Sequence, residues 1–127
     1  MKENKYYQMN AMKLAYVGDA VFSLMVRKHF VQNSLKKPSE LNKIVNSIVC
    51  ARNQAQLFKK LSGDLDEFEQ DVAMRARNLH INNKAKNSSY EEYSLATQYE
   101  AIIGFWYLTD QLDKLNKYVE IALENQG

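Results

Sequence analysis

Apolar residues follow helical spacing along most of this chain, and little in the sequence interrupts them. Between residues 41 and 58 the apolar side chains recur at steps of three and four, at Leu41, Ile44, Val45, Ile48, Ala55 and Phe58. No segment shows the sustained apolar–polar alternation of a half-buried strand. Four glycines and one proline leave few positions at which a helix would break. The sequence therefore predicts an all-α fold.

Capping signals set the predicted helix boundaries. Ser39 is a predicted N-cap with Pro38 just outside the helix, and that helix continues to about Gly63. Asp64 with Glu67 resembles a capping box, which places a helix start at this pair. The predicted helices cover about residues 10–30, 39–63, 64–78, 88–108 and 110–124.

The chain has the length and composition of one compact domain. Its 127 residues are 46% hydrophobic, and no repeat or linker divides them, so residues 1–127 are predicted to form a single domain. Cys50 is the only cysteine and cannot form an internal disulfide, which is typical of a reducing compartment. The N-terminal residues lack the apolar run of a signal peptide, and no stretch is long enough to cross a membrane. We expect a cytoplasmic protein with no membrane contact.

Charge is distributed unevenly, although the net charge is only +2. Residues 62–71 contain five acids and no base. Residues 73–90 contain no acid, and they carry Arg75, Arg77, His80, Lys84 and Lys86. The basic segment is where a polyanion would be bound. Acids at the start of a helix and arginines at its end also complement the helix macrodipole, so a purely structural role for the arginines stays open.

A lone carboxylate stands in the most apolar segment, LAYVGDAVFSLMV, at Asp19. A helical wheel places Asp19 away from Lys13 and on the same face as Met12, Phe22 and Val26. Burying a carboxylate there costs several kcal/mol unless a cation or hydrogen-bond donors compensate. The adjacent Gly18 costs roughly 1 kcal/mol of helix propensity relative to alanine. Asp19 is then a functional acid, a core acid paired with an arginine, or a solvent-facing acid, and Gly18 could simply let another helix approach.

A second unexpected carboxylate, Glu100, lies in the apolar part of the fourth predicted helix. Thr97 and Gly104 are one turn away from it, and Tyr93 and Tyr107 are two turns away. Two acids from two helices, each near a glycine, could converge on one hard divalent cation such as Mg²⁺, which prefers carboxylate, water and phosphate oxygens. No histidine or cysteine spacing supports a zinc site.

The motifs that carry these acids resemble those of the ribonuclease III family. LAYVGDAVF is similar to the family signature, approximately E-R-L-E-F-L-G-D-A-V-L, and TQYEAIIGFWYL is similar to the second motif, D-x-F-E-A-L-I-G-A-x-Y-L. The order of LAYVGDAVF, then RARN at 75–78, then Lys86-Asn87, then TQYEAIIGFWYL is similar to the Mini-III branch, which has the nuclease domain without a double-stranded-RNA-binding domain. The resemblance spans residues ~11 to ~110.

The resemblance implies an all-helical endonuclease domain with a smaller acid set than the larger enzymes of the family. Asp19 and Glu100 fall on two of the family's catalytic, metal-binding acids. The other two acids fall on Ala15 and Thr97, as in the Mini-III branch. The Thr97 hydroxyl then either orients a metal-bound water or satisfies a backbone carbonyl. Tyr16 falls on the signature aromatic residue that packs across the dimer interface.

The resemblance also implies a substrate, a cofactor and partners. It predicts a Mg²⁺-dependent homodimer that cleaves double-stranded RNA and leaves 5′-phosphate ends, with the stem of precursor 23S ribosomal RNA as the substrate class of the Mini-III branch. A ribosomal protein or subunit is a further candidate partner. The candidate RNA-binding residues are Arg75, Arg77, Asn78, Lys84, Lys86 and Asn87. The competing hypothesis is a non-catalytic helical module for RNA binding or ribosome assembly.

Overall fold

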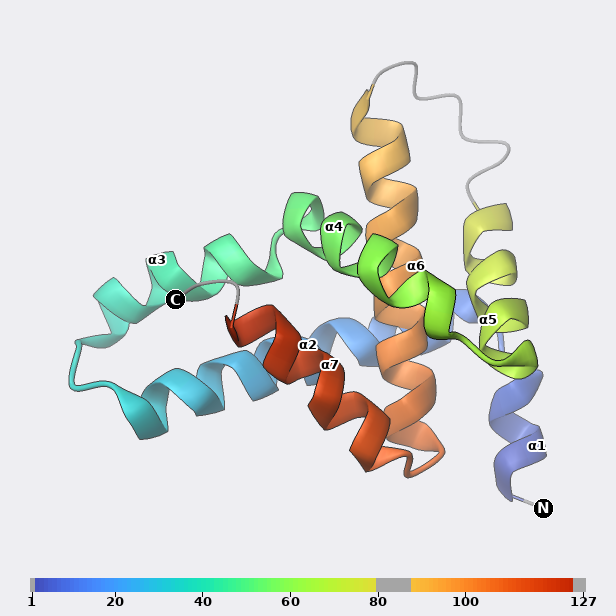
Figure 1. The fold of residues 1–127 in the computed structure, drawn as a ribbon, viewed down its shortest axis with the longest axis horizontal. Helices are drawn as coiled ribbons and strands as arrows, with labels where there is room; N and C mark the ends of the chain where they lie inside the picture. Colours follow the sequence, from blue (N-terminus) through green and yellow to red (C-terminus); the bar gives the residue numbers. More distant parts are fainter. Residues whose placement is uncertain (1, 80–87, 125–127) are drawn as a thin grey trace.

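The structure, a computed structural model, describes residues 2–79 and 88–124 (Figure 1). Within these ranges it contains helices and no strand, which confirms the predicted all-α fold. The elements are α1 (Lys2–Tyr7), α2 (Ala11–Asn33), α3 (Pro38–Val49), α4 (Ala51–Leu61), the 3₁₀ helix η1 (Ser62–Asp64), α5 (Glu67–Asn78), α6 (Ser88–Leu108) and α7 (Leu112–Glu124). No described helix combines the length and the apolar character that spanning a lipid bilayer requires.

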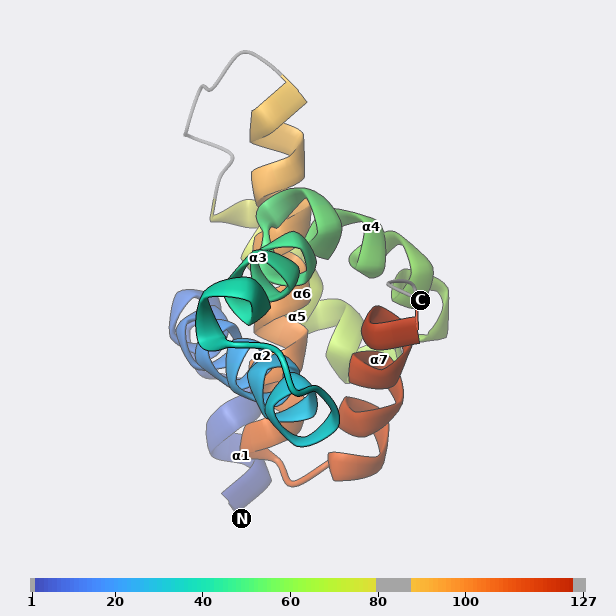
Figure 2. The ribbon, with the colours of Figure 1, turned by 90° about the vertical axis from the view of Figure 1, so that its left-hand side faces the viewer.

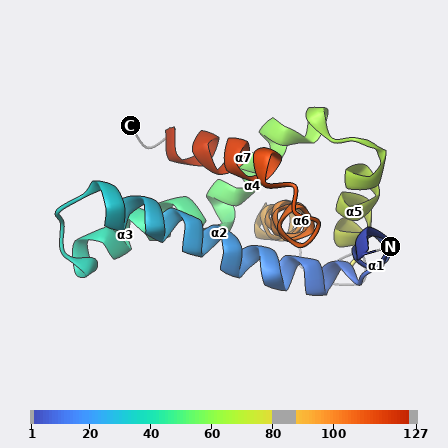
Figure 3. The same ribbon diagram turned by 90° about the horizontal axis from the view of Figure 1, so that it is seen from below.

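The centre of the fold is α6. Figure 3 looks nearly along this helix and shows α2 on one side, α5 on a second, and α4 with α7 on a third. Residues 101–106 are all buried, so this part of α6 has no solvent face. The second half of α2 and α3 extend away from α6 and pack against each other (Figures 1 and 2). Residues 96–99 are buried as well, so the half-buried Glu100 lies between two buried stretches of α6.

The single helix predicted over residues 39–63 is wrong, because the structure has two helices there that are separated at Cys50. Cys50 has φ −68° and ψ 157°, an extended conformation that ends α3 and begins α4. Asn53 Nδ2 donates to the carbonyl of Ile48 over 2.8 Å, and Gln54 Nε2 donates to that of Val49 over 2.9 Å. These amides satisfy carbonyls that the helix end leaves without partners. The break redirects the chain so that α4 packs against α6.

The predicted cap at the start of α3 is also wrong. Pro38 lies inside the first turn of α3 and Lys37 is the N-cap, so Ser39 is helical. Proline fits here because its fixed φ is helical and the first turn needs no donor from its nitrogen.

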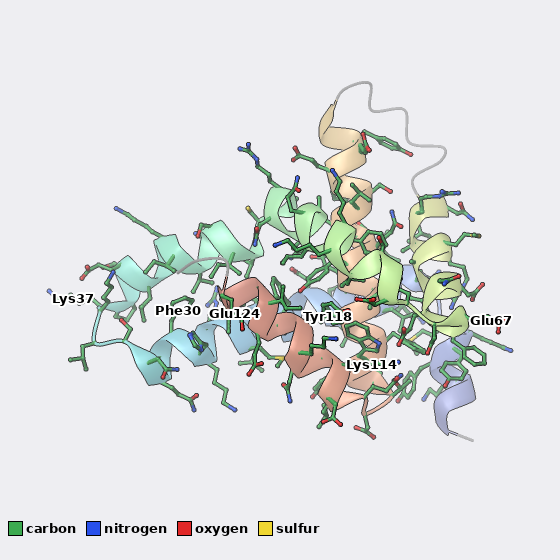
Figure 4. The ribbon with its side chains drawn as sticks, viewed as in Figure 1. Phe30, Lys37, Glu67, Lys114, Tyr118 and Glu124 are labelled. Atoms are coloured by element: carbon green, nitrogen blue, oxygen red, sulfur yellow. The ribbon has the colours of Figure 1, made fainter. Side chains whose placement is uncertain are left out.

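The capping box lies two residues later than predicted, at Asp66 and Glu69 rather than at Asp64 and Glu67. Glu69 is buried, and its Oε1 accepts from the Asp66 backbone N–H over 2.8 Å. Its Oε2 accepts from Trp106 Nε1 over 2.7 Å and from Lys114 Nζ over 2.6 Å. Figure 4 shows Lys114 on α7, whose neighbour Tyr118 donates from its hydroxyl to Asp64 over 2.8 Å. The acidic run therefore starts α5 and holds α7 against it.

The last helix begins at Leu112 rather than at residue 110, because a tight turn at Asp110 precedes it. Asp110 has φ 58°, a left-handed conformation that aspartate tolerates. The backbone N–H of Asp110 donates to Tyr107 over 3.2 Å, and that of Gln111 donates to Trp106 over 2.8 Å. This is the bond pattern of a Schellman motif, and it ends α6 before α7 begins.

Candidate active site

The helices α2 and α6 cross in direct backbone contact at two glycines. A Cβ atom on Gly18 would lie 1.7 Å from the carbonyl oxygen of Glu100, and one on Gly104 would lie 2.0 Å from that of Leu14. Neither distance leaves room for a side chain, so only glycine fits at either position. The structure thus confirms that Gly18 lets another helix approach, and Gly104 is its counterpart on α6.

This crossing brings Asp19 and Glu100 together. A side-chain hydrogen bond joins the two carboxyl groups, Glu100 being partly buried. Burial, followed by the hydrogen bond and the negative charge of Asp19, raises the pKa of Glu100 from 4.5 to about 8. A hydrogen bond with Gln54 acts in the opposite direction and lowers it. A carboxyl group with a pKa near 8 keeps its proton at neutral pH in the absence of a cation, so Glu100 is protonated there.

Of the three alternatives left open for Asp19, the structure shows the solvent-facing one, although the helical wheel placed it on the face of Phe22 and Val26. Phe22 and Val26 are fully buried, but Asp19 itself is exposed and Met12 is 48% exposed. The reason is that α6 crosses α2 at Gly18, and the next side chain stays at the open edge of that crossing. Asp19 is therefore not a core acid. It is a solvent-accessible carboxylate that faces a partly buried one.

The donor chemistry of this pair fits a hard divalent cation. Both side chains offer oxygen ligands, and the proton that Glu100 keeps near pH 7 is the charge that a cation would replace. Among the residues that the structure describes, no group of three or more His, Cys, Asp or Glu side chains gathers to form a metal site. An ion here would thus take two carboxylates from the described part of the chain and its other ligands from water or substrate oxygens.

The raised pKa of Glu100 predicts a pH-dependent stability in metal-free buffer. Between pH 4.5 and about 8 the native state binds a proton that the unfolded state does not, so stability falls as pH rises through this window. Glu100→Gln cannot titrate. Relative to the unmodified protein, we expect the free energy of unfolding of this variant to rise by roughly 2 kcal/mol between pH 5.5 and pH 8.5. This figure allows for the partial exposure of Glu100. Urea unfolding in EDTA measures this difference.

Glu91→Gln, at an exposed glutamate on the same helix, is the control for that experiment. We expect its stability to follow that of the unmodified protein at both pH values. Parallel curves for Glu100→Gln and the unmodified protein would show that the pKa of Glu100 is not raised.

Thr97 and Ala15 are the positions that the resemblance aligns with two further acids, and no described contact joins either side chain to the carboxyl pair. The Thr97 side chain is buried, and its hydroxyl donates to the backbone carbonyl of Tyr93 over 2.9 Å. This contact favours the structural role that the sequence left open for Thr97. Ala15 is buried in the core of the fold.

Arg75 holds the N-terminal segment in place. Its Nη1 donates to the carbonyl of Met9 over 2.6 Å, its Nη2 donates to that of Tyr7, and its Nε pairs with Asp71 at 3.0 Å. The Tyr7 ring stacks on Phe68 with 4.6 Å between ring centroids. The sequence predicts no helix at α1 and a phosphate contact for Arg75. These bonds occupy its guanidinium and explain the residue structurally.

Of the other predicted RNA-binding residues, the structure describes two, Arg77 and Asn78. Arg77 and Asn78 are exposed at the C-terminal end of α5. Arg77 lines a hollow together with Ser94 and Gln98 of α6, which places it at the opening between these two helices. Lys84, Lys86 and Asn87 lie outside the described residues.

Tyr16, the predicted dimer contact, is 81% exposed on the outer face of α2. Asp19 is exposed one turn further along the same face, and Met12 is exposed one turn before it. A large aromatic side chain this exposed is typical of an interaction surface when it belongs to an apolar group. The proposed dimer surface therefore adjoins the carboxyl pair.

An all-α domain that joins two carboxyl groups at the open edge of a helix crossing has the arrangement of a helical, cation-dependent hydrolase. The sequence profile of the Ribonuclease III domain matches residues 12–111. The chain belongs to the ribonuclease III family, in its Mini-III branch, and is a double-stranded-RNA-specific endoribonuclease. Enzymes of this family generally depend on a divalent metal and typically act as dimers.

Relatives of similar length support this placement. The chain is 31% identical over 118 residues to the Mini-ribonuclease 3 of Streptococcus pneumoniae, an alignment that covers 91% of this chain and 92% of that protein. It is 37% identical over 113 residues to the Mini-ribonuclease 3 of Brevibacillus brevis, covering 89% and 84%. The crystal structure of a Fusobacterium nucleatum protein superposes with a TM-score of 0.84 at 32% identity, covering 94% of this chain and 96% of that one.

Proposed function

We propose that this protein is a Mg²⁺-dependent enzyme that cleaves the double-stranded stem joining the ends of precursor 23S ribosomal RNA. The proposal places it in the cytoplasm as a homodimer, with residues 1–127 as one catalytic domain and with 5′-phosphate and 3′-hydroxyl product ends. The observation that carries it is the hydrogen-bonded pair of Asp19 and Glu100 at the glycine crossing. Mg²⁺ is the cation proposed because it accepts few carboxylates and keeps water and phosphate oxygens as its other ligands.

In this mechanism Asp19 and Glu100 hold the ion through their carboxylate oxygens. When bound, Mg²⁺ supplies a water of lowered pKa and stabilises charge at phosphorus. Glu100 releases its proton as the ion binds, since a cation favours the charged form of a carboxyl whose pKa is raised to about 8. The backbone contact between α2 and α6 keeps both carboxylates in place without any rearrangement.

The proposed dimer places one such site on each strand of the duplex. Tyr16 and Met12 are exposed apolar side chains on the face of α2 that carries Asp19. A two-fold interface formed by this face would bring two sites to the two sides of one axis. Each site would then cut one strand of the same double helix.

The proposed duplex contacts come from Arg77 and Asn78 at the end of α5, with Lys84, Lys86 and Asn87 from the following segment. Such residues would contact phosphates and 2′-hydroxyls, because the major groove of an RNA duplex is too narrow for side chains to read its bases. A ribosomal protein or subunit remains a proposed helper, because the precursor stem belongs to an assembling ribosome.

Arg77 and Arg75 should respond differently to substitution by alanine. Arg77→Ala is expected to weaken binding to many duplexes and to reduce the salt slope of binding by roughly 1, as one phosphate contact is lost. Arg75→Ala should leave the salt slope unchanged and lower thermal stability, because the Tyr7 and Met9 carbonyls lose their donor. Filter binding at several salt concentrations and thermal unfolding measure the two effects. A salt slope that falls equally in both variants would assign both arginines to RNA.

The function itself is tested with two RNA duplexes of equal length, one built from the precursor 23S stem and one of shuffled sequence. With Mg²⁺ we expect cleavage of both strands of the precursor stem, product 5′ ends that accept ligation as phosphates, and no cleavage in EDTA. Sedimentation at micromolar concentration should show a dimer. Tight duplex binding with no cleavage in Mg²⁺ would instead support the non-catalytic RNA-binding module.

A further inference from the structure

Gln54 on α4 is a buried amide in an apolar environment. Its side chain is 1% exposed, and its helix neighbours Ala55, Leu57 and Phe58 are buried as well. Burying an amide costs free energy unless its donors and acceptor find partners, whereas leucine or methionine would fill the same space without that cost. No motif in the sequence predicts a role for this residue. Its burial therefore calls for a specific function of the amide.

The nitrogen and the oxygen of this amide differ in their hydrogen bonding. Gln54 Nε2 donates to the carbonyl of Val49 over 2.9 Å, which fixes the side chain at the break between α3 and α4. A second side-chain hydrogen bond joins Gln54 to Glu100. Gln54 Oε1 is buried and has no hydrogen-bond partner among the residues that the structure describes. The donor end of the amide is thus anchored, while its buried acceptor oxygen has unused bonding capacity.

Three helices consequently meet at the carboxyl pair. Asp19 comes from α2, Glu100 from α6 and Gln54 from α4, and both α2 and α4 pack closely on α6. The neighbouring Asn53 makes a similar bond to the end of α3, from Nδ2 to the carbonyl of Ile48 over 2.8 Å. Asn53 therefore shares the capping role of Gln54 without its contact to Glu100, and the two roles are separable by substitution.

We propose that Gln54 is a positioning residue of the metal site, which holds the Glu100 carboxylate by its amide and offers Oε1 as acceptor to a water carried by the divalent cation. This inference rests on the proposed function of the carboxyl pair. An amide oxygen only accepts hydrogen bonds, and a cation-bound water is a strong donor, so the two are complementary. Such outer partners of a metal typically change its affinity by roughly 10- to 100-fold when removed.

Two substitutions at Gln54 and one at Asn53 test the proposal. Gln54→Met keeps the length of the side chain and removes its polar atoms. Gln54→Glu keeps an acceptor oxygen and removes the donor to Val49. Asn53→Leu removes the comparable bond to the end of α3. The readouts are Mg²⁺ and Mn²⁺ affinity by calorimetry, thermal unfolding in EDTA, and kcat and KM on an RNA duplex.

We expect Gln54→Met and Asn53→Leu to lower the unfolding temperature similarly, since each loses one capping bond. Only Gln54→Met should weaken metal affinity, by roughly tenfold or more, with kcat falling at subsaturating metal and KM for RNA unchanged. Gln54→Glu should bind metal at least as tightly as unmodified protein. Unaltered metal affinity in Gln54→Met, or equal losses in Gln54→Met and Asn53→Leu, would overturn the assignment.

The same titrations separate this inference from the proposed function. Metal binding that disappears in Asp19→Asn while persisting unchanged in Gln54→Met would retain the carboxyl site and remove only the role of Gln54. Unmodified protein that shows no binding sensitive to Asp19→Asn would remove the metal site itself.

Discussion

Replacing either acid of the pair by its amide, Asp19→Asn or Glu100→Gln, is expected to reduce duplex cleavage by roughly a thousandfold or more. The amides keep the shape of the side chains but cannot carry the negative charge that holds a divalent cation. Because the described part of the chain brings two carboxylates to this crossing, losing one removes half of the protein's charge at the site. Single-turnover cleavage of a labelled duplex in Mg²⁺ measures the loss.

Duplex binding provides the control for these variants. We expect the affinity of both for RNA to stay within about threefold, since phosphate contacts elsewhere supply most of it. Glu91→Gln, on the same helix but at an exposed position, should cleave normally. Full activity in either Asp19→Asn or Glu100→Gln would refute the catalytic assignment, and lost binding would show that the amide disturbs the RNA surface instead.

The second large effect is expected at the glycine crossing. Gly18→Ala and Gly104→Ala should each lower the free energy of unfolding by roughly 3 kcal/mol or more, because the added methyl group meets backbone atoms rather than a movable side chain. Moving α2 away from α6 to make room would also separate Asp19 from Glu100, so residual folded protein should cleave poorly. Urea unfolding monitored by circular dichroism measures the change.

Gly63 provides a matched control within the same chain. A Cβ atom at Gly63 meets nothing within 4 Å, and none of the three glycines that the structure describes has a positive φ. Gly63→Ala should therefore leave stability unchanged or raise it by roughly 0.5 kcal/mol through the unfolded state. If Gly18→Ala were as stable as Gly63→Ala, the close contact between α2 and α6 would not hold in solution.

The sequence was sufficient to predict the helical class and the two acids, because both leave a local signature. Apolar steps of three and four fix helices, and an acid beside or near a glycine in an apolar segment is costly enough to require a reason. Asp19 and Glu100 both satisfy that criterion, and the structure brings them together. The residues that determine the helix crossing, Gly18 and Gly104, were visible from the same segments.

What the sequence could not supply depends on tertiary contacts. The break at Cys50 has no proline or glycine to mark it and depends on amides from Asn53 and Gln54. The helical wheel placed Asp19 on the face of Phe22 and Val26, and it does not show where the neighbouring helix crosses. In the sequence Arg75 resembles a cation that binds RNA, and only the structure shows that it donates to the Tyr7 and Met9 carbonyls. The one available signal for Gln54 was an uncharged polar residue three and four positions before the apolar Leu57 and Phe58.

Trp106 gives the enzyme an intrinsic optical reporter. It is the only tryptophan in the chain, its indole N–H donates to Glu69 of α5, and its ring stacks on Tyr118 of α7 with centroids 5.4 Å apart. Its fluorescence emission therefore depends on the docking of two outer helices onto the central one. Release of α7 would expose the indole to water and shift its emission to longer wavelengths, so unlabelled protein can be followed through refolding or RNA binding in a stopped-flow fluorimeter.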